Sequence, residues 1–315
     1  GENKNRKLVE VKNEITLKEI IKTELNAAKK LGIDGFDFYY PGASEGISEA
    51  YNMIIATYFE VAEENNIDDF YFTLCLSDCK ISSDYKKNAN VMAKRINKLL
   101  AKTKDYPNWL KTPDGRLLFY TFAPDSFTFG HENKNQHFKS EEDLNKKMAM
   151  VAKTYKLLSS KLELPCAVLY SISNYRTFKS YHRKKKIYPD LDFYYKYIDT
   201  VLDYFPGLAT SFVESVFNDN NEKISSYIAQ RVEERNRTYV QRAHTEFTMS
   251  KIRSPQGMIK AAKSNLSYEP RQLKRYYYGT GLSYGFRELL DRAIKYNADM
   301  IAIPSWNDYQ EGHHM

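Results

Sequence analysis

The last residues of the chain hold its densest group of side chains that could do chemistry. The run reads Ser305-Trp306-Asn307-Asp308-Tyr309-Gln310-Glu311-Gly312-His313-His314. It follows a short apolar stretch, residues 301–304, that is typical of a strand. Asp308 and Glu311 are two carboxyl groups three residues apart. Where a strand passes into a loop, this spacing can place one as a proton donor and the other as a base on a substrate.

The elements that must position this run alternate regularly along the chain. Helical spacing and turn residues predict helices at 17–31, 44–66, 85–101, 140–162, 193–205, 221–235 and 284–296. Apolar runs predict strands at 35–40, 70–76, 116–122, 166–171, 209–213, 239–243 and 300–304. Such alternation indicates parallel strands joined by crossover helices, in either an open doubly wound sheet or a closed barrel.

The barrel is the favoured fold. Gly279-Thr280-Gly281 is the nearest approach to the phosphate-binding loop of a doubly wound sheet, but it follows tyrosines and no strand. The weakly apolar stretch 8–11 is the candidate first strand. After the last predicted strand, 300–304, no helix is predicted before Met315. We therefore expect a (β/α)8 TIM barrel that is incomplete at its first strand and last helix, in a single domain spanning residues 1–315.

Further polar side chains are expected beside the C-terminal run. In a (β/α) barrel the functional residues lie where strands end and loops begin. Five side chains fall at or near such ends, namely Asp37, Tyr39, Asp78, Glu214 and His244. Each alone could be a loop cap or half of a salt bridge, but together they favour a polar binding site at one end of the barrel.

Composition excludes several classes of function. The chain has 315 residues and a net charge of +7, but its basic residues are interspersed with acidic ones and match no nucleic-acid-binding motif. No apolar run is long enough to cross a bilayer. Cys75 and Cys79 are only four residues apart along an extended stretch and Cys166 opens another strand, so we expect three buried thiols with no disulfide and no zinc site. No cofactor is expected.

The C-terminal run resembles that of glycoside hydrolase family 71, the α-1,3-glucanases, and more distantly family 99, the endo-α-mannosidases and endo-α-mannanases. Family 71 chains look like Trp-Asn-Asp-aromatic-x-Glu-Ser-His-Tyr here, whereas family 99 has Glu at the position of Asp308. The stretches 27–36 and 76–78 also resemble family passages. Arg242-Ala243-His244 departs from the family pattern, which often has Pro and Trp there.

The resemblance implies a glycosidase with an inverting mechanism, in which Glu311 is the general acid and Asp308 the base that activates water. Inverting enzymes hold these carboxyl groups roughly 6.5–9.5 Å apart. Trp306, Asn307 and His313 would contact the sugar, with Asp37, Tyr39, Asp78, Glu214 and His244 as further substrate-binding residues. The partner would be an α-linked polysaccharide, best α-1,3-glucan, which places the protein outside the cell, in a periplasm or at the cell surface.

Three alternatives stay open. A family-99-like enzyme would cleave α-mannosides with retention of configuration. A non-catalytic polysaccharide-binding barrel, or a domain serving surface-glycan synthesis, would keep the binding site without hydrolysis. The third, a metal-dependent hydrolase using His313 and His314, is disfavoured because adjacent side chains of an extended chain point to opposite sides.

Overall fold

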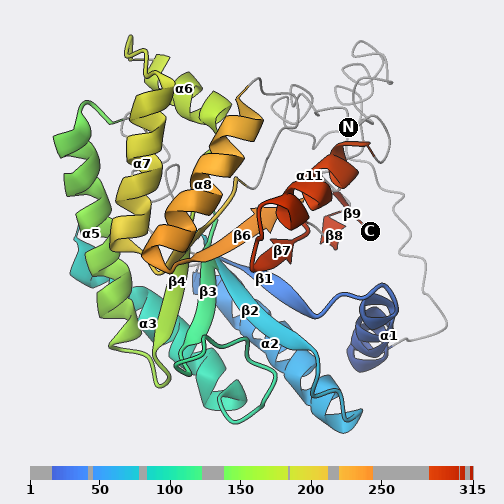
Figure 1. Cartoon of the computed structure of the whole chain (residues 1–315). Coiled ribbons are helices and arrows are strands. Elements are labelled where there is room, and N and C mark those ends of the chain that lie inside the picture. The colour runs from blue at the N-terminus through green and yellow to red at the C-terminus, as the bar shows by residue number, and fades with distance from the viewer. Residues whose placement is uncertain are drawn as a thin grey trace, which may run out of the picture.

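The computed structural model describes residues 16–41, 45–77, 84–122, 138–183, 185–211, 220–243, 284–304, 306–308 and 313–314. Figure 1 shows how its helices and strands are arranged. In chain order they are α1 (Leu17–Lys30), β1 (Gly35–Pro41), α2 (Glu45–Glu64), β2 (Tyr71–Ser77), α3 (Tyr85–Thr103), β3 (Leu117–Thr121), α5 (Glu141–Ser159), β4 (Cys166–Ser171), α6 (Tyr175–Arg183), α7 (Leu191–Tyr204), β5 (Gly207–Ala209), α8 (Asn221–Arg235), β6 (Thr238–Arg242), α11 (Tyr284–Lys295), β7 (Met300–Ala302), β8 (Asn307–Asp308) and β9 (His313–His314).

The sheet confirms the predicted barrel. Strands β1 to β7 lie side by side in the order of the sequence, and every neighbouring pair is parallel. A doubly wound sheet would reverse this order at a switch point. The seven strands instead curve in one direction into a nearly closed barrel with helices around it (Figure 1). This is a (β/α)8 TIM barrel, incomplete within the described residues; the candidate strand at 8–11 lies outside them.

Strands β2 to β6 are mostly buried on both faces, because each face of the sheet packs against an apolar layer. Alternate residues of β3 face opposite ways: Leu118 and Tyr120 belong to a small cluster inside the barrel, whereas Leu117 and Phe119 belong to the large cluster beneath the helices. The inner cluster consists of Cys75, Leu118, Tyr120, Ala167, Leu169, Ala209 and Val240. Because side chains alternate between the two faces of a strand, the position of a residue along the strand shows whether it points into the barrel.

Helix ends follow the signals in the sequence. Thr16 and Glu19 form a reciprocal capping box at the start of α1, and Gly32 follows this helix with a φ of +75°. The Ser140 side chain accepts from the backbone N–H of Asp143 and caps α5, whose first turn is acidic as the positive end of a helix dipole favours.

Two details differ from the sequence-based expectation. Helix α6 was not predicted; it is short, and the Asn174 side chain caps it by accepting from the backbone N–H of Thr177 (2.8 Å). Strand β5 is Gly207–Ala209, so it begins two residues before the predicted strand 209–213, of which 212 and 213 lie outside the described residues. Its first residue, Gly207, lies so close to the backbone of β6 that a β-carbon there would be 2.3 Å from the Thr238 carbonyl oxygen.

The buried His182 is a packing residue of α6. Its Nε2 accepts from the backbone N–H of Phe138 (3.0 Å), and its Nδ1 lies 2.7 Å from the carbonyl oxygen of Phe178. Since a carbonyl can only accept, Nδ1 carries the proton and the ring is neutral. The imidazole thus ties Phe138, just before α5, to α6.

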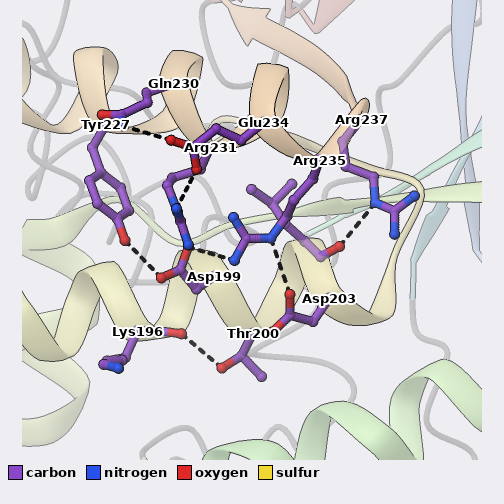
Figure 2. A network of polar contacts seen from close by, with 11 residues as sticks. Lys196, Asp199, Thr200, Asp203, Tyr227, Gln230, Arg231, Glu234, Arg235 and Arg237 are labelled. Atoms are coloured by element: carbon purple, nitrogen blue, oxygen red, sulfur yellow. Dashed lines mark hydrogen bonds and ion pairs between the residues drawn. The ribbon is translucent and has the colours of Figure 1, made fainter.

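A polar network holds α7 against α8 (Figure 2). The Asp199 carboxylate accepts from the Tyr227 hydroxyl (2.7 Å) and from Nε of Arg231 (2.7 Å), and it pairs with Arg235 (3.2 Å). Arg235 also reaches Asp203, at 3.1 Å. The Asp199 side chain is 19% exposed and the Asp203 side chain 59%, so only the first is shielded enough to matter much for stability.

We predict that Asp199→Ala lowers the free energy of unfolding by about 1–2 kcal/mol, because it strips three half-buried donors of their shared acceptor. Asp203→Ala, the matched control on the same helix, should cost less than about 0.5 kcal/mol. Urea unfolding followed by circular dichroism measures both. Equal losses in the two variants would show that Asp199 does not organise this interface.

Candidate functional site

The C-terminal run continues from the last strand of the barrel. After β7 come Trp306 and two short antiparallel strands, in which Asn307 pairs with His314 and Asp308 with His313. For these paired residues the structure describes the backbone alone. Glu311, Asp78, Glu214 and His244 lie outside the described residues. The pairing therefore brings the Asp308 backbone next to that of His313.

Trp306 joins the start of this run to the other edge of the sheet. Its ring lies 5.4 Å from the ring of Phe36 on β1, tilted by 48°. Both residues pack against the apolar layer beneath the helices, so the indole ring contributes to packing. This contact places the beginning of the run beside β1, although the two segments are 270 residues apart.

Asp37 and Tyr39, two predicted site residues, are on the inner face of β1. In the register of the sheet Asp37 is beside Thr73 and Tyr39 is beside Cys75, a member of the inner cluster. Residues paired in this way point to the same side of a sheet. Tyr39 is 42% exposed, and its ring meets the Phe122 ring edge to face, with centroids 5.3 Å apart.

The Asp37 carboxyl combines access to solvent with a strongly desolvated setting. Its side chain is exposed, yet it lies among the residues of the barrel interior, and this enclosure raises its pKa from 3.8 to about 6. The guanidinium of Arg242 acts in the opposite direction and favours the ionised form. Burial raises the pKa of the Tyr120 hydroxyl, and the nearby Asp37 carboxyl adds to that rise. The inner face thus carries a carboxyl group that can change its protonation near neutral pH.

Arg242 is held rigidly at the carboxyl end of β6. It is only 2% exposed, and its Nη1 donates to Oγ of Ser171 (2.7 Å) and to the carbonyl oxygen of Thr210 (3.3 Å). These acceptors belong to the ends of β4 and β5, so one guanidinium links three adjacent strands. A guanidinium keeps its charge in proteins, and its burial therefore requires such acceptors.

Sequence reasoning missed Arg242 and Phe122 as parts of the site. Arg242 occupies an inward position of a buried strand, where a charged residue is unusual. Its place in the alternation of inward and outward side chains could have indicated this. Phe122 follows Tyr120 by two residues and faces the same way, so alternation alone could have placed it beside the inner layer.

The described part of the chain also bears on metal binding and on membrane insertion. There, no three His, Cys, Asp or Glu side chains are arranged to bind a metal ion, and no helix has both the length and the apolar character needed to traverse a bilayer. Cys75 and Cys166 are buried, as predicted, and burial raises the pKa of the Cys166 thiol to about 12; Cys79 lies outside the described residues.

Comparison with known proteins gives structural similarities only. No family model and no curated protein matches the sequence. Similar solved structures include an endo-β-1,4-mannanase double mutant from Cellulomonas fimi, with a TM-score of 0.47, 10% identity, and coverage of 84% of this chain and 54% of that one. Another is named "putative alpha-L-fucosidase", from Bacteroides thetaiotaomicron VPI-5482, with a TM-score of 0.49, 10% identity, and coverage of 93% and 84%.

A third similar structure is an engineered protein, with a TM-score of 0.45, 12% identity, and coverage of 88% and 57%. The chain spans about half the length of the mannanase and of the engineered protein.

We predict that Asp37→Asn raises the melting temperature at about pH 8 and leaves it unchanged at about pH 4. The folded state binds the Asp37 proton more tightly than the unfolded state, because its pKa is raised from 3.8 to about 6. The resulting stability is fully present below about pH 4 and is lost as the pH rises through about 6. An amide resembles the protonated acid and removes this loss.

Scanning calorimetry at the two pH values measures the effect. Asp34→Asn is the matched control, because Asp34 is an exposed acid just before the same strand and its loss should change neither value. A lower melting temperature for Asp37→Asn at about pH 8 would show that the ionised carboxyl stabilises the fold.

Proposed function

We propose that the chain is a glycoside hydrolase that cleaves an α-linked polysaccharide, with α-1,3-glucan as its substrate. Glu311 would protonate the departing oxygen, and Asp308 would activate the attacking water, so that the anomeric configuration inverts. Asn307 and His313 would bind sugar hydroxyls. Residues 1–315 would act as one catalytic domain, and a polysaccharide substrate implies work outside the cell or at its surface.

The observation that supports this proposal most directly is the contact between Trp306 and Phe36. It places the start of the carboxylate-bearing run beside β1, the strand that carries Asp37 and Tyr39 on its other, inner face. The sequence assigned these two residues independently to the same site. A site of this kind would combine a pair of acids with aromatic and polar groups on a neighbouring strand. Carbohydrates need this combination because they present hydroxyl groups at their edges and C–H groups on their faces.

The backbone pairing of Asp308 with His313 adds a second, weaker support. In the proposed site this pairing would restrict the chain around Glu311, which is two residues before His313 in the sequence. Catalysis benefits from such restriction, because acid and base must be held in place before the substrate arrives.

We predict that Glu311→Gln and Asp308→Asn each lower kcat by about 10²- to 10⁴-fold, while the affinity for the polysaccharide stays within about twofold. Asp291→Asn is the matched control, since Asp291 is an exposed acid on α11. Reducing-sugar release from α-1,3-glucan measures turnover. Wild-type turnover in the Glu311 variant would contradict its role as the acid.

The anomer of the new reducing end tests the mechanism. Proton NMR should detect β-anomer first when wild-type protein acts on α-1,3-glucan, because water attacks from the face opposite the leaving group. An α-anomer released from an α-mannan would point to the retaining alternative. Binding of the glucan without any release would make the chain a polysaccharide-binding protein.

A further inference from the structure

The inner faces of β1 and β3 carry an aromatic pair next to a carboxyl group. Tyr39 is more exposed than its neighbours in the strand, and Phe122, which packs against the inner apolar cluster, braces it edge to face. Asp37 is two residues before Tyr39 on the same face. We propose that Tyr39, Phe122 and Asp37 form a sugar subsite that binds one pyranose ring.

The geometry of the pair suits a sugar ring. The two rings are nearly perpendicular, at 86°, so Phe122 fixes the orientation of Tyr39 while leaving it partly exposed. A tyrosine fixed in this way loses little side-chain freedom when a ligand stacks on it. The C–H face of a pyranose can therefore pack on the tyrosine ring.

Asp37 supplies the polar half of the subsite. Along a strand, two residues span roughly 6.6 Å, so the carboxyl lies within reach of hydroxyl groups on a ring stacked at Tyr39. Asp37 makes no hydrogen bond to any residue that the structure describes, although Arg242 favours its ionised form. An ionised carboxylate is a strong acceptor, and sugar hydroxyl groups are donors of the matching kind.

The position of the subsite separates it from the acid pair. Tyr39 and Phe122 stand near the carboxyl ends of β1 and β3, whereas Asp308 and Glu311 follow β7 in the sequence. This inference rests on the proposed function, because it assigns a sugar-binding surface to the same end of the barrel. It concerns binding alone and assigns no chemical step to Asp37.

Isothermal titration of the full chain carrying Glu311→Gln tests the subsite without turnover. The probes are α-1,3-linked gluco-oligosaccharides and α-linked manno-oligosaccharides of increasing length. We expect Tyr39→Ala and Asp37→Asn each to raise Kd by about tenfold and Phe122→Leu by about threefold. Tyr39→Phe should keep Kd within about twofold of the parent value, because it retains the aromatic ring. This result would show that Tyr39→Ala weakens binding through lost stacking.

Tyr71→Ala is the matched control: Tyr71 is 41% exposed, but it begins the neighbouring strand β2, at the opposite end from the proposed site. Its Kd should equal that of the parent. Failure of every probe to bind the parent, or equal affinity in the Tyr39→Ala, Asp37→Asn and control variants, would overturn the subsite. Wild-type protein that binds sugar through Tyr39 but releases no reducing ends would overturn the proposed hydrolysis and leave the subsite standing.

Discussion

A permanent positive charge inside an apolar barrel constrains the residues around it. The Arg242 guanidinium cannot lose its proton, so the barrel must supply acceptors and negative charge. Ser171 and Thr210 provide the acceptors from two neighbouring strands, and Asp37 provides negative charge on β1. The inner face therefore cannot be a uniform apolar core. Its polar groups gather toward the carboxyl ends of the strands, which is where a (β/α) barrel can use them.

Burial and the attraction of Arg242 have opposite effects on the pKa of Asp37. Enclosure by protein raises the pKa of its carboxyl group, and Arg242 limits that rise. The outcome, a pKa of about 6, leaves the group largely ionised at neutral pH at a cost to folding. A carboxylate that stabilised the fold would show the opposite shift. Groups that a protein keeps at the expense of stability are often ones that it uses for binding or chemistry.

Sequence periodicity predicted the barrel well, because strands buried on both faces, such as β2, β3 and β4, leave clear apolar runs between amphipathic helices. It missed α6, whose apolar Tyr175 and Phe178 lie in a short polar stretch. For the site, the alternation of side chains along the predicted strand was enough to place Asp37 and Tyr39 on the same face. The role of Arg242 was not, since its acceptors come from two other strands and only the folded register brings them together. The contact of Trp306 with Phe36 likewise depends on the curvature of the whole sheet.

Glycines at the start of two strands have a consequence for how this chain can vary. At Gly35 and Gly207 a β-carbon would lie 2.3 Å from a carbonyl oxygen of the next strand, so neighbouring backbones meet there at a distance that no other residue permits. Both contacts are at the amino ends of strands, opposite the end where Arg242 and Tyr39 are found. Sequence drift in this fold should therefore be uneven. One rim of the barrel is fixed by close backbone contact, and the other is free to exchange loops and acquire new specificities while the scaffold stays the same.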